Sequence, residues 1–385
     1  MKSFLTKMAC IVIFIAIVSL GFCRISLAAK ESYKIGAIFS VTGPASWLGE
    51  PERNTAKMIV DQINATGGIN GHPLELIVYD TEGDETKAVL NAKKLIEKDN
   101  VLAIIGPSCS GPSLAIIPTI TKAQVPNISC AAAASIVSPV KKWVFKTPQS
   151  DVFCAEVMYE YMKTKGITKV AIISVSSGFG DNGRQELLKA SEKMGIKVVA
   201  DERYGGKDTD MTAQLTKIKG TDAQAIINWS IGPTQVIVTK NVSQLGIKIP
   251  LFQSHGFGNT KNIEQAGGSA ESVLAPIGRL LVADVLPSYH YHKSLLMNYN
   301  NEYKAKFGAE SSTFGGHAYD AMHILIAALS NVGPDRVKIR DYVENMRGFI
   351  GTAGIFNFSP DDHNGLTKDS FEMLKVKGPR FVLAD

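Results

Sequence analysis

Short apolar runs alternate along most of the chain with segments in which apolar residues recur every three or four positions. The runs are rich in β-branched residues and predict buried strands, whereas the helical spacing predicts amphipathic helices between them. The predicted strands are Tyr33–Phe39, Leu74–Tyr79, Val101–Gly106, Pro126–Cys130, Val170–Val175, Lys197–Arg203, Ala225–Asn228 and Pro250–Gln253, with a terminal pair near Ile355–Phe358 and Phe371–Val376. The predicted helices are Pro51–Ala65, Thr86–Lys98, Leu114–Ala123, Asp151–Lys165, Gly183–Met194, Met211–Ile218, Thr234–Leu245, Ser294–Phe307, Ala318–Ser330 and Val337–Met346. This alternation indicates parallel sheets covered by helices on both faces.

Two segments break the rhythm. Trp143–Gln149 (WVFKTPQ) interrupts it first, and a series of helices follows Val273–Leu281. A chain of 385 residues is also longer than one ordinary domain, and its 45% apolar content supplies a large core. We therefore expect two lobes.

The first residues have a different pattern. Lys2 and Lys7 precede an uncharged apolar run that ends at Cys23, and small residues lead up to Ala28. This order predicts a secretory signal peptide, residues 1–28, that is cleaved after Ala28. A retained membrane anchor is the alternative, but the run is short for a bilayer span. A lipid anchor on Cys23 is left open.

Charge and cysteine content narrow the class of protein. The formal net charge is +5, and loss of the signal segment would lower it to about +2. The chain has no basic stripe, which argues against nucleic acid or an anionic membrane as partner. Cys109, Cys130 and Cys154 would remain after cleavage. Their odd number leaves at least one thiol outside any internal disulfide, and a Cys109–Cys130 pair is left open.

The most informative stretch begins with the first predicted strand. Residues 35–80 read IGAIFSVTGPASWLGEPERNTAKMIVDQINATGGINGHPLELIVYD, and residues 103–111 read AIIGPSCSG. A buried strand enters a Gly-Pro loop carrying Trp47, an amphipathic helix follows, and a Gly-Gly-x-x-Gly return leads to a second strand ending in Asp80. This pattern resembles the extracytoplasmic solute-binding proteins of branched-chain amino-acid-type ABC importers, the leucine/isoleucine/valine-binding protein family.

The resemblance implies an α/β fold of two Rossmann-like lobes with parallel sheets, joined by a three-strand hinge. The N-terminal lobe would comprise residues 29–148 and 283–350, and the C-terminal lobe residues 149–282 and 351–385. It further implies a periplasmic monomer that is not an enzyme and needs no cofactor. Such a protein captures a small molecule between its lobes and delivers it to a membrane permease.

The resemblance also identifies candidate ligand contacts in the N-terminal lobe. The loop 106–111 leads into a helix whose N-terminal N–H groups favour an anion. Ser110 could instead merely cap that helix, but it falls on the family's carboxylate-contacting serine. Ala131 and Ala133 match family positions that offer a backbone carbonyl and a threonine hydroxyl. Ala133 departs from the family because it has no hydroxyl.

A larger departure lies in the other lobe. Amino-acid-binding members carry a glutamate for the ligand's ammonium after the strand that corresponds to Pro250–Gln253, and His255 stands at that position. Burying an ammonium without a carboxylate partner is costly. An imidazole can instead donate a hydrogen bond to a carboxylate, carbonyl or phenolic oxygen. The alternative is a loop histidine that bonds only to backbone.

Three aromatic residues accompany this change. Trp47 and Trp229 follow predicted strands, and Phe179 stands where amino-acid binders tend to carry tyrosine. Each could line the cleft or simply fill a lobe core, and ring faces in a cleft suit a flat apolar ligand. Together with His255 they predict a carboxylate ligand without an α-ammonium, an aromatic acid. A branched-chain amino-acid-binding protein of the same transporter class is the alternative.

One motif favours an enzyme. Residues 178–183 (GFGDNG) match G-x-G-x-x-G after a strand, and Asp201 and Glu202 follow at the spacing of a dinucleotide-binding fingerprint. Ser176 and Ser177 lengthen a turn that should be tight, and free NAD is scarce outside the cytoplasm. An NAD-dependent enzyme is therefore the weaker alternative. No histidine or cysteine spacing is typical of a metal site. An exported ligand-sensing module with the same fold is also left open.

Overall fold

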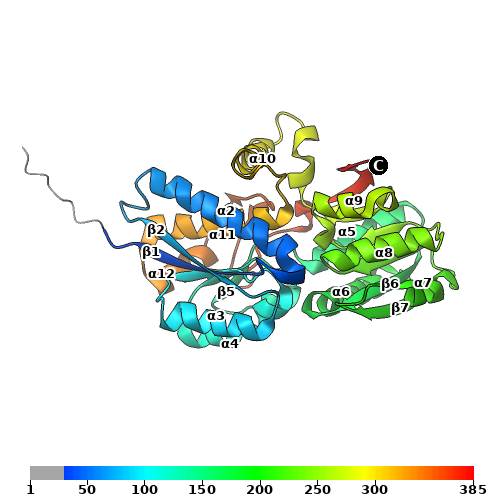
Figure 1. Cartoon of the computed structure of the whole chain (residues 1–385), viewed down its shortest axis with the longest axis horizontal. Coiled ribbons are helices and arrows are strands. Elements are labelled where there is room, and N and C mark those ends of the chain that lie inside the picture. Colours follow the sequence, from blue (N-terminus) through cyan, green and yellow to red (C-terminus); the bar gives the residue numbers. More distant parts are fainter. Residues whose placement is uncertain (1–29) are drawn as a thin grey trace, which may run out of the picture. The chain divides into compact units, whose positions relative to one another are not determined.

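The computed structural model of the protein describes residues 30–385, and the part from Ser32 onward contains two large sheets. The first sheet has the strand order β2-β1-β3-β4-β5, with all neighbours parallel. Its strands are β1 (Tyr33–Phe39), β2 (Leu74–Asp80), β3 (Ala103–Ile105), β4 (Asn127–Ser129) and β5 (Val144–Lys146). One face packs on α2 (Ser46–Ala65), α11 (Thr313–Val332) and α12 (Arg336–Glu344), and the other on α3 (Glu85–Glu97) and α4 (Ser110–Ala123) (Figure 1).

The second sheet has the order β14-β13-β10-β9-β8-β6-β7. Its strands are β6 (Lys169–Ser176), β7 (Lys197–Gly205), β8 (Ala225–Trp229), β9 (Leu251–Gln253), β10 (Leu274–Ile277), β13 (Glu372–Lys377) and β14 (Arg380–Leu383). The pairs from β7 to β10 are parallel, whereas β13 and β14 are antiparallel additions. The helices on one face are α5 (Asp151–Thr164) and α6 (Gly178–Met194), and those on the other are α7 (Thr212–Lys219), α8 (Pro233–Gln244) and α9 (Thr260–Ala266).

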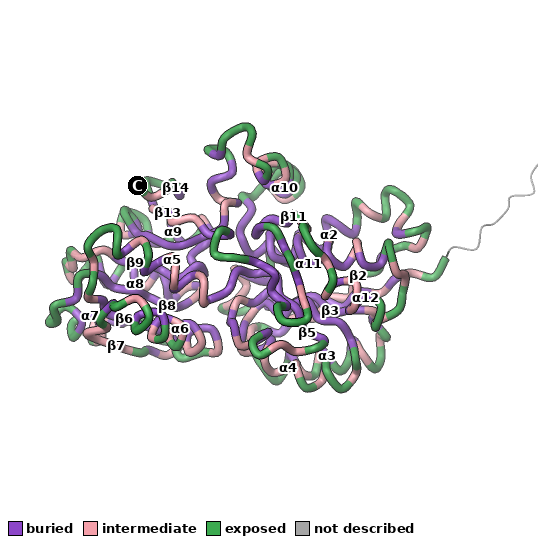
Figure 2. Tube along the Cα trace, turned by 180° about the vertical axis from the view of Figure 1, so that it is seen from behind, coloured by how far each residue is buried: buried purple, intermediate pink, exposed green. Residues whose placement is uncertain are grey.

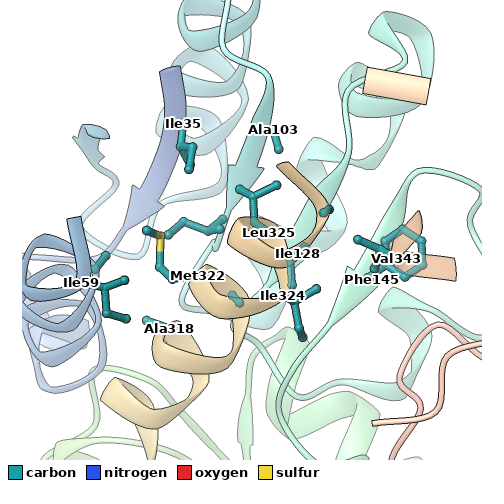
Figure 3. Packing of buried hydrophobic residues seen from close by; sticks show 14 of the residues in the cluster. Ile35, Ile59, Ala103, Ile128, Phe145, Ala318, Met322, Ile324, Leu325 and Val343 are labelled. Atoms are coloured by element: carbon teal, nitrogen blue, oxygen red, sulfur yellow. The ribbon is translucent and has the colours of Figure 1, made fainter. Parts of the chain in front are cut away.

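Successive side chains of a strand point to opposite faces of its sheet, so each sheet has a hydrophobic core on both faces. On β1, Ile35 and Phe39 pack with α2 and α11, whereas Ile38 packs with α3 and α4. Figure 3 shows the first of these cores, where Met322 of α11 and Ile59 of α2 belong to the same cluster as Ile35. The strands are therefore largely buried and the outer turns of the helices are exposed (Figure 2). A further helix, α10 (Lys293–Phe307), packs on α2.

The segments that connect the two sheets are tied together by hydrogen bonds. After β5, the Thr147 hydroxyl donates to the His317 carbonyl at 2.9 Å, and Gln149 Nε2 donates to the carbonyls of Ala353 and Ser370, both at 3.3 Å. These bonds join α11 to the segment after β5, and they join that segment to the one that leads to β13. They involve two of the three expected crossings, those near residues 148 and 351.

The lobe boundaries themselves stay a prediction. Core packing adds one observation on the last of them, which the sequence places at residue 351. Phe356, Phe358 and Leu366 pack in the core of the first sheet, and Phe371 packs in that of the second. The chain therefore changes core between Leu366 and Phe371. A short antiparallel pair, β11 (Phe349–Ile350) and β12 (Ile355–Phe356), precedes this change.

Several elements differ from the sequence prediction. Val144–Lys146 forms the strand β5, although the surrounding segment was expected to interrupt the pattern; three residues that include a lysine do not stand out as an apolar run. Helices α2, α4 and α6 begin at Ser46, Ser110 and Gly178, earlier than predicted. Serine and glycine suggested loops there, yet the first turn of a helix tolerates them. The helix α9 and the strands β10, β11 and β14 were not predicted.

The predicted signal peptide, residues 1–28, lies outside the described residues. Within residues 30–385, no helix combines the length and the apolar character that crossing a bilayer would require.

Candidate functional site

A cavity of about 580 Å³ is lined by segments that follow strands of both sheets. The lining segments from the first sheet are Ser108–Pro112 and Cys130–Ala132, and those from the second are Val175–Phe179, Ile231–Thr234 and His255–Gly256. The first turns of α4, α6 and α8 all lie at this cavity. Unpaired N–H groups and partial positive charge at helix N-termini favour an anion there.

Ser110 lies at the cavity as the first residue of α4 and is 3% exposed. Its Oγ accepts a hydrogen bond from the backbone N–H of Ala133 at 3.3 Å. The capping residue is Cys109, which makes no side-chain cap bond, so Ser110 does not cap the helix. A hydroxyl that accepts one bond still has its O–H to donate. Ser110 can therefore donate a hydrogen bond to an acceptor atom in the cavity.

The two alanines of the next loop differ in their position relative to the cavity. Ala131 lines the cavity, and its N–H donates to Ser129 Oγ at 3.1 Å. Ala133 is fully buried in the core beneath α3 and α4, and it is not among the lining residues. Ala133 acts on the site through its N–H bond to Ser110.

His255, Phe179 and Trp229 come together at one wall. His255 begins the short 3-10 helix η3 (His255–Phe257) and, like Phe179, lines the cavity. Its ring centroid lies 5.4 Å from that of Phe179 and 5.7 Å from that of Trp229, in edge-to-face geometry. Trp229 is fully buried behind both and does not line the cavity. His255 and Phe179 thus present the surface that Trp229 supports.

Trp47 is the remaining predicted aromatic contact. It lies in the first turn of α2, half-buried against the core of the second sheet, and is not among the lining residues. The Asn259 side chain donates to its carbonyl at 3.5 Å. The structure therefore places Trp47 in packing between elements of the two sheets.

Further residues of the cavity had no signal in the sequence analysis. His317 of α11 lines it and is 6% exposed, with Nδ1 unpartnered. Ser108 also lines it, and its hydroxyl donates to the buried Glu52 of α2. Burial raises the pKa of Glu52 well above its usual range, with the Ser108 bond opposing. Burial therefore favours the protonated, neutral form of this carboxyl.

Two ionisable side chains lie behind the lining. Lys146 of β5 is fully buried and donates to the carbonyls of Ala132 and Pro148 at 2.9 and 3.0 Å. Asp151, at the start of α5, is also fully buried. Burial lowers the pKa of Lys146 and raises that of Asp151, and the attraction between the two opposes both shifts.

The charges that do line the cavity are exposed. These are Glu82 and Glu85 from the first sheet and Lys207 and Asp208 from the second. The buried polar lining is neutral, since burial lowers the pKa of both His255 and His317 to about 3. The buried part of the cavity thus offers hydrogen bonds and helix N-termini but no lining carboxylate.

The glycines of the 178–183 motif have a packing role. A Cβ on Gly180 would lie 1.8 Å from the Val175 carbonyl oxygen, and a Cβ on Gly183 would lie 1.8 Å from Trp229 Nε1. Both contacts are far inside van der Waals distance. Helix α6 can approach β6 and β8 this closely only because these residues are glycine.

The substitution Gly183→Ala is accordingly expected to destabilise the fold by about 1–3 kcal/mol, because the indole of Trp229 must move within a filled core. Urea unfolding monitored by tryptophan fluorescence would measure the loss. Gly268→Ala is the matched control, since no atom lies within 4 Å of its added Cβ. Equal stability of the two variants would contradict the packing role.

Cys109, Cys130 and Cys154 are all free thiols in the structure. Cys109 Sγ lies 3.7 Å from Ser40 Oγ, and burial raises the pKa of the Cys109 thiol to about 12. The Cys109–Cys130 pair that the sequence left open is therefore not formed here.

Comparison with known proteins places this fold and cavity in context. The chain is 28% identical to the leucine-, isoleucine-, valine-, threonine- and alanine-binding protein of Pseudomonas aeruginosa over 330 residues, covering 84% of this chain and 86% of the relative. An extracellular ligand-binding receptor from Rhodopseudomonas palustris superposes with a TM-score of 0.87 at 28% identity, covering 92% of this chain and all of that chain. The branched-chain amino acid transporter substrate-binding protein of Streptococcus pneumoniae, in complex with isoleucine, superposes with a TM-score of 0.81 at 26% identity, covering 91% and 98%.

These relatives are binding proteins, and the predicted α/β fold with two sheets of parallel strands is confirmed by the likeness. Residues 32–377 match the periplasmic binding protein family. Because this match spans nearly all of the described chain, the protein belongs to the periplasmic binding protein family, as an extracytoplasmic solute-binding protein of the branched-chain amino-acid transporter type.

Proposed function

We propose that the protein captures a small carboxylate with a flat apolar body, an aromatic acid, in the 580 Å³ cavity and delivers it as a monomer to the permease of an ABC importer. The observation that carries this proposal is the charge pattern of the cavity. Three helix N-termini reach it, while its buried polar lining is neutral. Such a lining favours an anion and gives an ammonium no buried partner.

The carboxylate of the ligand would lie at the start of α4. The first-turn N–H groups of this helix have no partners within it, and the Ser110 hydroxyl lies beside them. Ala131 borders the same end of the cavity. Charge-assisted hydrogen bonds from N–H and O–H donors would hold the anion there.

The ring of the ligand would pack against Phe179 and His255. Both are more than nine-tenths buried yet line the cavity, and Trp229 fixes them from behind. Aromatic pairs in offset or edge-to-face geometry add about 0.5–1.5 kcal/mol beyond area burial. A ligand that contacts both lobes would favour the closed conformation, in which the lobes enclose it. The permease would recognise this closed conformation.

A thermal-shift screen tests the ligand class. Benzoate and cinnamate are expected to raise the melting temperature, because a ligand that binds only the native state adds about 2.7 kcal/mol at a hundredfold excess over its Kd. Leucine and isoleucine should have little effect. A shift with the amino acids alone would overturn the aromatic-acid proposal and favour a branched-chain amino-acid-binding protein.

The substitution Ser110→Ala is expected to weaken benzoate or cinnamate binding by about 1–3 kcal/mol, because a hydrogen bond to a charged group is lost. Isothermal titration calorimetry would measure the change in Kd. Ser113→Ala is the matched control: Ser113 lies one turn along α4, where its Oγ pairs with Ser129 Oγ at 2.8 Å, and it does not line the cavity. An unchanged Kd for Ser110→Ala would remove Ser110 from the carboxylate site.

A further inference from the structure

A cluster of buried ionisable groups lies at the wall formed by His255. The imidazole Nε2 of His255 is 3.6 Å from Asp151 Oδ1, and neither His255 nitrogen has a hydrogen-bond partner. Both carboxylate oxygens of Asp151 also lack partners, as does Nδ1 of His317. His255 and His317 are 8% and 6% exposed and both line the cavity. Buried polar atoms are normally satisfied, so five unpartnered atoms in and behind the cavity lining require a cause.

The surroundings of the cluster are mostly apolar and contain few charges. Phe179, Trp229 and Phe371 surround the His255 ring with centroids at 5.4–5.7 Å. The Cys154 thiol of α5 is the other ionisable neighbour on that helix, and burial raises its pKa, so it is uncharged. The remaining charges that act on the cluster are Lys146 from β5 and Glu186 from α6. Asp362 acts more remotely, through Lys146.

The protonation state of this cluster responds to an added charge. Without ligand, burial and the Lys146 charge keep His255 and His317 neutral. Burial likewise favours the neutral form of Asp151, because its carboxylate has no donor at either oxygen. A negative charge placed in the adjoining cavity would oppose the Lys146 charge and favour the protonated form of each group.

We propose that this cluster takes up a proton when a carboxylate binds in the cavity, so that the anion and a proton enter the site together. The proton comes from solvent and is held by the Asp151–His255 pair, as a carboxylic acid or as an imidazolium facing a carboxylate. The inference rests on the proposed function. It adds that the site binds its ligand as an acid, with little net change in buried charge.

The sign of the pH dependence follows from linkage. If binding takes up protons, the association constant rises as pH falls, by up to about tenfold per pH unit for one proton. Burial raises the pKa of Asp151, the carboxyl of this pair, to about 7, so the rise should be observed in the neutral range, between about pH 8 and pH 6. Below that range the group is protonated before the ligand arrives, and the affinity should level off.

Calorimetry of the purified protein with benzoate and with cinnamate tests this directly. The apparent enthalpy in Tris and in HEPES, which differ in ionisation enthalpy, gives the number of protons taken up. We expect about 0.3 to 1 proton per acid bound near pH 7.5. Binding with no proton exchange at any pH from 6 to about 8.5 would overturn the inference and leave the proposed function intact, whereas binding of neither acid would overturn both.

Two variants test which residues hold the added proton. Asp151→Asn should abolish the uptake and bind the acid more tightly than the unsubstituted protein near pH 8, because a negative charge behind the cavity lining is gone. A merely structural role for Asp151 would weaken binding at every pH instead. His255→Gln should also reduce the proton uptake. This variant can still test the proposal if Asp151→Asn does not fold. His323→Gln is the control, since His323 lies on α11 outside the cavity lining. Undiminished uptake in both cluster variants would contradict the assignment.

Discussion

Exchange of His255 for glutamate is expected to weaken binding of benzoate or cinnamate by about a hundredfold or more near pH 8. His255 lines the cavity at 8% exposure, and its Nε2 lies 3.6 Å from Asp151 Oδ1. A second carboxylate there would face both Asp151 and the bound acid in a region that excludes most water. Like charges in such a medium repel by several kcal/mol even at an effective dielectric constant of about 20.

Two comparisons separate the effect of charge from that of shape. His255→Gln keeps a neutral side chain that can donate one hydrogen bond, and its loss of affinity should stay below about tenfold. The loss in His255→Glu should also shrink near pH 5.5, because protonation of the new carboxyl removes the repulsion. Calorimetric Kd values for the three proteins at both pH values decide the matter. Unaltered affinity in His255→Glu would show that His255 is not at the ligand site.

The sequence predicts the framework of this site well because the framework depends on local periodicity. Strands such as Tyr33–Phe39 lie where continuous apolar runs place them, since a strand buried on both faces cannot alternate. The loops that follow these strands could then be assigned to one edge of each sheet. Ser110, Ala131, Phe179 and His255 all lie at the cavity for that reason.

Burial, in contrast, could not be read from the same pattern. Trp229 ends a buried strand, where a side chain can point either to the cavity or to the sheet interior. It fills the interior, packed so closely on α6 that position 183 must be glycine. Trp47 was expected in a loop, but it lies in the first turn of α2 because the helix extends through the Ser-Trp-Leu-Gly segment. Sequence spacing carries no information on which way these rings turn.

The cluster of ionisable residues around His255 could not be predicted from the sequence, for a different reason. Lys146, Asp151, His255 and His317 come from β5, α5, η3 and α11, and no two of these elements except β5 and α5 are neighbours in sequence. Of these, only His255 was predicted at the site, from its match to a family position. Val144–Lys146 was not predicted as a strand, so nothing in the sequence marked Lys146 as buried. Only the three-dimensional fold brings its partners together.

The second large expected effect concerns Asp320, which lies one turn from His317 on α11. Asp320→Ala is expected to lower the free energy of unfolding by about 3–5 kcal/mol, because two or more buried donors lose their acceptor. Asp320 is fully buried and accepts hydrogen bonds from Thr352 N and Ala353 N and, at 3.1 Å, from Thr352 Oγ1. These bonds hold the segment that leads from the first sheet toward the second. Removal of the carboxyl leaves two buried backbone N–H groups without an acceptor.

The pH dependence of this loss distinguishes a buried carboxyl from a surface ion pair. Burial raises the pKa of Asp320 to about 7, with the bonds from Thr352 and Ala353 opposing. A carboxyl whose pKa is raised on folding stabilises the native state most at low pH, and this contribution falls as pH rises toward the folded pKa. The Asp320→Ala penalty in urea unfolding should therefore be larger near pH 5.5 than near pH 8. Asp320→Asn, which keeps one acceptor oxygen, should lose less at both. A penalty below about 1 kcal/mol for Asp320→Ala would mean that the connecting segment holds its place without α11.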